Sequence, residues 1–191
     1  FRGGLSAGFN GDAFWASDIA GFTGPAPSPE LYIRWSQWGI LSPLCRFHGA
    51  NSPREPWHFG DKAVEVVRHY TKLRYRLLPY FKVCAAEAYQ TGVPLMRHLH
   101  LEYPSDPATT SIDDQFLLGP NLLIAPIFEA GATSRMVYFP EGTWEHFEAP
   151  GNTVEGGRWH SVDAALERIP IFQKAGSVVP MLEEAPSFIE S

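Results

Sequence analysis

The chain has 191 residues, of which 45% are hydrophobic and 14% aromatic, a composition that supports buried cores and excludes a disordered chain. Its formal net charge is −6, with 15 Lys and Arg against 21 Asp and Glu, so we expect no nucleic-acid partner. No apolar run approaches the roughly 20 residues of a membrane-spanning helix, and the first residues lack the regions of a signal peptide, so we expect no membrane partner.

An apolar, glycine-rich stretch near the start predicts a first strand. The run 13–16 is apolar and leads into a polar tip, so we expect a buried strand that ends on Asp18. A loop rich in proline and glycine follows. Ser28 and Pro29 then have the residue types of a helix N-cap and a first helical position, which predicts a helix to about Leu41.

A second strand and a long helix come next. Residues 44–48 have the pattern of a short strand that ends on His48, before a loop with two prolines. Apolar side chains then recur at spacings of three and four, which predicts a long helix that Asp61 caps, Pro79 kinks and Gly92 ends. The order strand, helix, strand, helix is typical of βα units on a parallel sheet, and two such units do not close a fold alone.

The character of the sequence changes at Val93, so we expect two domains, residues 1–92 and residues 93–191. Strand-like runs separated by Gly and Pro follow a short helical piece at 111–118; they are 122–128, 135–139, 143–147 and 169–172. This pattern predicts a small antiparallel β-sandwich, with hairpin turns at residues 140–142 and 174–176.

Asp18 and His48 each occupy the expected carboxy end of a strand, where the loops of a βα barrel converge on one mouth. A carboxylate accepts hydrogen bonds from paired sugar hydroxyls, an imidazole donates to another, and rings such as Trp15 and Phe22 cover the apolar face of a sugar. These residue types therefore suit carbohydrate. A loop-capping Asp and a hydrogen-bonded loop His are the alternatives at this point.

Other candidate sites do not hold together. His98 and His100 alternate along an apparent strand, but no third metal ligand is evident, so a structural pair is the better interpretation. Asp113 and Asp114 fit the first turn of a short helix better than a general-base pair. The two cysteines lack metal-site spacing and are interpreted as buried thiols, and there is neither a phosphate-binding glycine motif nor a GxSxG elbow. We therefore expect no metal and no cofactor.

Two ordered motifs carry a family resemblance. Residues 14–22 read F-W-A-S-D-I-A-G-F and resemble the W-x-x-D-I-G-G-F segment of family 31 glycoside hydrolases, with Ala20 in place of the first glycine. Residues 46–49, R-F-H-G, resemble the R-x-H-G motif of the next barrel unit in that family. Further segments follow in matching order and extend the resemblance over nearly the whole chain: 34–42, 53–57, 73–80, 94–97, 116–126, 140–144 and 169–180.

The resemblance implies the last two βα units of a (β/α)8 TIM barrel followed by the proximal C-terminal β-sandwich. In the family, the Asp, His and aromatic residue of these motifs bind the sugar, which carries over to Asp18, His48 and Phe22, with Trp15 as a further substrate-binding candidate. The implied mechanism is retaining: one Asp forms a glycosyl-enzyme, and a second protonates the leaving oxygen and then activates water. Both lie upstream in the family, so we expect no catalytic residue here and no hydrolysis by the isolated chain.

We therefore expect part of an α-xylosidase or α-glucosidase that cleaves terminal α-linked xylose or glucose from an oligosaccharide or small α-glycoside. The remainder of the enzyme is its expected partner, and the motif details favour the xylosidase branch slightly. Two alternatives stand beside it: a non-catalytic carbohydrate-binding module, and a subunit that completes the barrel of another chain. The linkage, the compartment and the oligomeric state, including a homo-oligomer, stay open.

Overall fold

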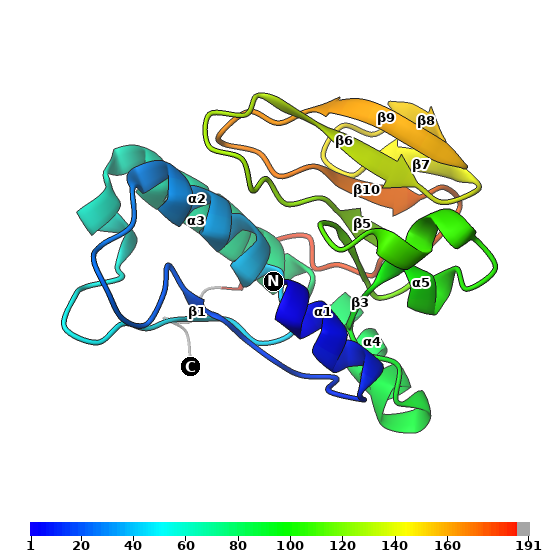
Figure 1. Ribbon diagram of the computed structural model, residues 1–191, viewed down its shortest axis with the longest axis horizontal. Helices are drawn as coiled ribbons and strands as arrows, with labels where there is room; N and C mark the ends of the chain where they lie inside the picture. The colour runs from blue at the N-terminus through cyan, green and yellow to red at the C-terminus, as the bar shows by residue number, and fades with distance from the viewer. Residues whose placement is uncertain (187–191) are drawn as a thin grey trace.

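Figure 1 shows two groups of elements, with helices and a small parallel sheet in one and a stack of antiparallel strands in the other. The computed structural model describes residues 1–186. In chain order its elements are α1 (Arg2–Phe9), β1 (Asp18–Ile19), α2 (Pro29–Ile40), β2 (Arg46–Phe47), η1 (Pro56–Phe59), α3 (Asp61–Arg76), α4 (Leu78–Thr91), β3 (Met96–Arg97), α5 (Leu99–Glu102), η2 (Pro107–Ser111), β4 (Phe116–Leu118), β5 (Leu122–Ile124), β6 (Ser134–Phe139), β7 (Thr143–His146), β8 (Thr153–Glu155), β9 (Arg158–Asp163) and β10 (Ile171–Lys174). No helix within residues 1–186 is long and apolar enough to cross a membrane.

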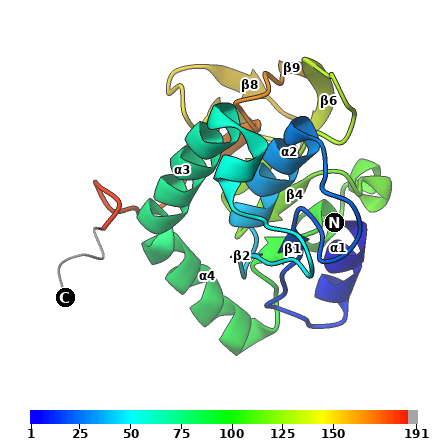
Figure 2. The ribbon, with the colours of Figure 1, turned by 90° about the vertical axis from the view of Figure 1, so that its left-hand side faces the viewer.

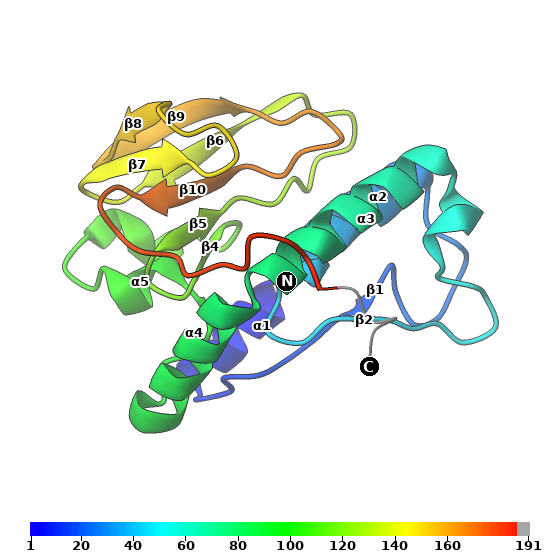
Figure 3. The same ribbon diagram turned by 180° about the vertical axis from the view of Figure 1, so that it is seen from behind.

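The first group contains two parallel strands, each followed by a helix. β1 pairs with β2 in the register Asp18 to Arg46 and Ile19 to Phe47, and the two strands lie next to each other in Figure 2. α2 connects them, and α3 follows β2 and packs beside α2 (Figure 3). The order and the parallel pairing are those that the sequence predicts for two βα units.

The strand expected over residues 13–16 is wrong. Residues 12–17 have no regular structure, and a helix, α1, precedes them where glycines alternate with apolar side chains. A strand needs a neighbour to pair with, and this part of the chain runs along β2 only at Asp18 and Ile19. Asp18 therefore begins strand β1 instead of ending a longer one.

The helix signals are mostly confirmed. Ser28 caps α2, its hydroxyl accepting a hydrogen bond from the Leu31 backbone at 3.2 Å. The long helix breaks between α3 and α4 just before Pro79, and it ends at Gly92 in the left-handed conformation, φ 77°. Asp61 does not cap α3, because it is the first helical residue and makes no side-chain capping bond.

The second group is antiparallel throughout. One sheet has the order β3-β4-β5-β10-β7-β8, and the other pairs β6 with β9. The hairpin expected at residues 140–142 is wrong, because this turn joins strands of two different sheets, and 174–176 does not join two strands either. The helical piece expected at 111–118 is also wrong, because β4 occupies its second half. An apolar run that is buried on both faces has no alternation that would reveal it as a strand.

The six-stranded sheet separates two hydrophobic cores. Phe116 and Leu118 of β4 belong to a cluster with the buried side chains of the helices. Leu117 and Leu123 belong to a second cluster, together with Phe139 of β6. Successive side chains of a strand point to opposite faces, so one face of this sheet packs on the helices and the other on the β6–β9 sheet. The sheet thereby supports helix α2, which contacts strand β1 of the candidate site.

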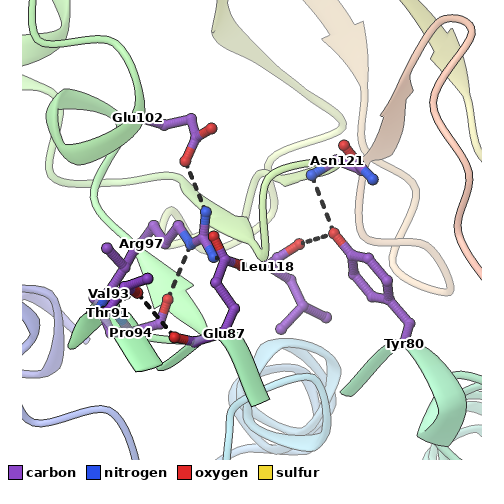
Figure 4. A network of polar contacts seen from close by, with 9 residues as sticks. All are labelled: Tyr80, Glu87, Thr91, Val93, Pro94, Arg97, Glu102, Leu118 and Asn121. Carbon is purple, nitrogen blue, oxygen red and sulfur yellow. Dashed lines mark hydrogen bonds and ion pairs between the residues drawn. The ribbon is translucent and has the colours of Figure 1, made fainter. Parts of the chain in front are cut away.

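Polar bonds tie the two groups together. Arg97 of β3 is 1% exposed and donates to the carboxylates of Glu87 and Glu102, from α4 and α5 (Figure 4). The Tyr80 hydroxyl of α4 donates to the Leu118 carbonyl of β4 at 2.8 Å (Figure 4). The guanidinium of Arg97 thus joins elements from both sides of Gly92.

His98 and His100 have the structural role that the sequence favours, but the secondary structure around them and around Asp113 differs from the one expected. His98 caps α5 through its Nδ1, which accepts from the His100 backbone at 3.1 Å, so these two histidines do not alternate along a strand. Asp113 lies in a loop before β4, outside any helix, and pairs with Arg2 at 2.9 Å.

Candidate functional site

Asp18 faces Arg46 across the parallel pair β1–β2. Its Oδ1 accepts a hydrogen bond from Arg46 Nε at 2.5 Å, and 20% of the Asp18 side chain is exposed. Among residues 1–186 no donor contacts Oδ2 of Asp18. One carboxylate oxygen is therefore held by a fixed cation, while the other is free to accept a hydrogen bond.

The chain reverses directly after β1. The Gly21 backbone donates to the Asp18 carbonyl at 2.8 Å, and two successive residues of this reversal are left-handed, with φ 69° at Ala20 and 83° at Gly21. Glycine adopts such angles without strain, whereas a residue with a Cβ pays about 1–2 kcal/mol. Ala20 stands where the resembling family motif has glycine, so this tight turn persists here despite the side chain.

The turn brings Phe22 against His48. The two rings lie 5.1 Å apart between centroids at an interplanar angle of 33°. The Ala50 backbone donates to the Phe22 carbonyl at 2.6 Å, so the two loops also touch through their backbones. Both side chains are exposed, and no hydrogen bond within residues 1–186 occupies the ring nitrogens of His48.

Trp15 lies apart from these residues. Its ring is half-buried, 6.5 Å from Trp38, and covers the backbone of Gly4 so closely that a Cβ there would be 2.0 Å from the ring. The side chain therefore packs between α1 and α2 and joins the hydrophobic core. Sugar contact by Trp15 has less support than contact by the other three residues.

Asp18 and His48 are connected through the parallel pair β1–β2. Arg46 of β2 stands opposite Asp18, and His48 follows two residues later, just beyond the end of β2. A hollow of about 220 Å³ lies beside His48 and does not include Asp18 or Phe22; its lining is Phe47, His48, Gly49, Ser52, Pro53, Arg54 and Glu55. That Asp18 and His48 serve one site stays a prediction, and the strand expected before Asp18 is absent.

Sequence reasoning missed two arginines of the site. Arg46 was noted only as part of the R-F-H-G motif, and its contact with Asp18 depends on a register that only the structure reveals. Arg54 is 3% exposed and lies beneath the loops of Phe22 and His48. Arg54 lies in the segment 53–57 of the family resemblance, but a single arginine between two prolines in a polar loop gives no sign that it is buried.

The groups present can bind a polyhydroxylated ligand. Asp18 supplies an acceptor, His48 a donor or acceptor according to its tautomer, and Phe22 an apolar face. No group of three His, Cys, Asp or Glu within residues 1–186 is placed to hold a metal ion. Burial raises the pKa of the Cys84 thiol to about 11, which keeps it protonated and unsuited to nucleophilic chemistry.

Known protein families match the two halves of the chain separately. The model for the TIM-barrel domain of glycosyl hydrolases family 31 matches residues 1–82. The model for the glycosyl hydrolase family 31 C-terminal domain matches residues 92–179. The order of the two matches follows the order of the two groups of elements.

Individual relatives agree with the family models. The chain is 42% identical over 179 residues to alpha-glucosidase 2 of Bacillus thermoamyloliquefaciens, and 41% identical over 186 residues to an alpha-xylosidase of Emericella nidulans. A GH31 dextranase of Flavobacterium johnsoniae, solved in complex with glucose, is similar with a TM-score of 0.89 at 42% identity, over 95% of this chain. The chain spans only 22%, 24% and 23% of these three proteins, respectively.

Proposed function

This chain belongs to glycosyl hydrolase family 31, as the end of its TIM-barrel domain and its C-terminal domain, and on that premise we propose a role in sugar binding. Asp18, His48 and Phe22 contact the sugar whose glycosidic bond is cleaved by a retaining α-glycosidase. The observation that carries the proposal is the open geometry of these three groups on neighbouring loops. The last two βα units of the barrel and a domain boundary near residue 92 are parts of the same proposal, with residues 187–191 outside the described structure.

Each group has a distinct task. Asp18 accepts from sugar hydroxyls through its free oxygen, and the bond from Arg46 to the other oxygen orients that carboxylate. His48 exchanges a hydrogen bond with a further hydroxyl, and Phe22 covers the apolar C–H face of the ring. Trp15 packs between α1 and α2, and direct sugar contact is its weaker role.

Bond cleavage needs two carboxylates about 5 Å apart, one as nucleophile and one as acid and base. We assign neither role to a residue of this chain, and place both in the remaining part of the enzyme. The isolated chain then binds sugar weakly or not at all and hydrolyses nothing. A stand-alone carbohydrate-binding module is the weaker candidate, because residues 1–82 match a barrel domain.

The substrate class is a terminal α-linked glucose or xylose. The glucosidase and xylosidase relatives are 42% and 41% identical to the chain, so identity does not separate the two sugars. The two differ only at C6, where xylose lacks the hydroxymethyl group. We place the residues that select at that position in other parts of the enzyme.

A segment exchange tests the proposal. The matching segment of the Flavobacterium johnsoniae dextranase is replaced by this chain, and hydrolysis of dextran is measured. The proposal predicts an active hybrid that loses about 100-fold or more in kcat/KM with Asp18→Asn or His48→Ala, because each change removes a contact to the reacting sugar. Arg68→Met, an exposed change on α3, is the control. Full activity of the Asp18→Asn hybrid, or turnover of an aryl α-glycoside by the isolated chain, contradicts it.

A further inference from the structure

The loops that carry Phe22 and His48 have little regular structure to hold them. β1 and β2 pair over only two residues each, and both side chains lie beyond the ends of these strands. Besides the strands, a backbone bond from Ala50 to the Phe22 carbonyl joins the loops. The stacking of the two rings therefore depends on whatever else fixes the distance between the loops.

Arg54 makes that connection. Its Nε donates to the Gly21 carbonyl at 2.8 Å, in the loop that leads to Phe22. Its Nη1 donates to Ser52 Oγ at 2.5 Å and to the Pro53 carbonyl at 3.1 Å, in the loop that follows His48. One planar guanidinium thus binds both loops at once, which a lysine ammonium on its flexible stem does not reproduce.

Arg54 is itself anchored in the core. Its carbonyl accepts from the Tyr32 hydroxyl at 2.7 Å, and the Tyr32 ring is fully buried and stacks on Phe59 at 3.8 Å between centroids. Burial raises the pKa of Tyr32 well above its ordinary value, so this hydroxyl stays a donor. Arg54 therefore connects the two loops to helix α2, through the hydrogen bond between its carbonyl and the Tyr32 hydroxyl.

The backbone next to His48 is shaped around the same side chain. A Cβ at Gly49 would lie 2.9 Å from Arg54 Cγ and 2.9 Å from the Ser52 carbonyl oxygen. The φ of Gly49 is not positive, so its backbone conformation does not require glycine. The lack of space for a Cβ does. The stem of Arg54 thus runs directly against the residue that follows His48.

Stability alone does not account for a charge at this position. Arg54 is 3% exposed, forms no ion pair within residues 1–186, and its Nη2 has no protein acceptor there. A buried cation bound only by neutral oxygens keeps a desolvation cost that a neutral side chain would avoid. What the guanidinium adds is geometry, in two directions at once.

We propose that Arg54 is a positioning residue of the sugar site, which sets the spacing of Phe22 and His48 through the Gly21 carbonyl and the Ser52 hydroxyl. The catalytic relevance of this spacing rests on the proposed function, whereas the spacing itself does not. Arg54 touches no substrate. Its removal changes how the two rings meet.

NMR of the 191-residue chain tests the spacing. Phe22→Ala calibrates the ring-current shift that Phe22 exerts on the His48 ring protons. Arg54→Lys, which keeps the charge, is expected to lose most of that shift, and Ser52→Ala a smaller part. Arg34→Lys is the matched control, because Arg34 is also buried and donates to backbone carbonyls, but of the β-domain loops. In the Arg34→Lys variant, the ring-current shift of the His48 protons should persist.

Two results overturn the proposal: Arg54→Lys in a folded chain with the full shift, or, if that variant does not fold, Ser52→Ala with the full shift. In the dextranase hybrid, Arg54→Lys should lower kcat/KM by at least about tenfold while Arg34→Lys leaves it unchanged. An inactive parent hybrid contradicts the proposed function, but the ring-current shift still decides on Arg54. If the parent hybrid is active but Arg54→Lys keeps the full ring-current shift, only the role of Arg54 is contradicted and the proposed function stands.

Discussion

Replacing Arg97 by methionine should destabilise the chain substantially. The side chain is 1% exposed, and it donates to Glu87, to Glu102 at 2.7 Å and to the Pro94 carbonyl at 3.0 Å. Methionine keeps most of the apolar stem but removes all of these bonds. Glu87 and Glu102 would then lack their cation.

The magnitude follows from burial. Breaking a buried ion pair costs about 3–5 kcal/mol, because the remaining charge is left without a partner. Here the carboxylates keep 38% and 28% of their side-chain surface exposed, so water replaces part of the lost interaction. We therefore expect the free energy of unfolding to fall by about 2–4 kcal/mol.

Urea unfolding followed by tryptophan fluorescence measures this change. The midpoint should shift while the slope stays constant. The double variant with Glu87→Gln should lose less than the sum of the two single changes, because the pair is coupled. Arg68→Met, on the exposed surface of α3, should change stability by less than about 0.5 kcal/mol. A comparably small change for Arg97→Met would refute the reasoning.

Two further changes test the packing and the charge network. Gly119→Ala should cost about 2–4 kcal/mol in the same unfolding assay, because φ is 57° and the new Cβ would lie 2.4 Å from Cys84 Sγ. Gly176→Ala is the control: its φ is 75° but a Cβ there meets open space, so it should cost only about 1 kcal/mol. Equal costs for the two variants would contradict the clash at Gly119. Burial raises the pKa of Glu148, but His69 at 2.7 Å and a neighbouring arginine lower it by more than burial raises it. The pKa of Glu148 therefore lies below its ordinary value. A depressed folded-state pKa stabilises the fold above the ordinary pKa, and this stability is lost as the pH falls through the folded-state value. The stability difference between the parent chain and Glu148→Gln should therefore be larger at neutral pH than at a pH well below the ordinary carboxyl pKa, and a difference that stays constant on acidification would contradict the network.

Local signals in the sequence predicted the helices well. Ser28 and Pro79 act on the turn in which they stand, so their effect on the backbone does not depend on distant partners. The strands were less accessible. β6 pairs with β9 across more than a dozen residues, and the turn after it resembles a hairpin although it connects two sheets. Such pairing depends on which apolar faces must be covered, and a local pattern does not contain that information.

The candidate site divides in the same way. Asp18 and His48 could be proposed as one site from sequence, because they follow the βα order and stand in motifs that resemble a family. The left-handed turn at Ala20 could be suspected only through the glycine of that motif. Arg54 could not be found, because its function in the structure is to join two loops whose proximity arises from the parallel pairing of β1 with β2.

A crystal structure of the dextranase hybrid with bound glucose or xylose tests the central claim most directly. The account predicts a sugar whose hydroxyls lie within about 3 Å of the Asp18 carboxylate and a ring nitrogen of His48, with the Phe22 ring on its apolar face. A sugar bound in the active centre without contact to Asp18 or His48 would contradict it.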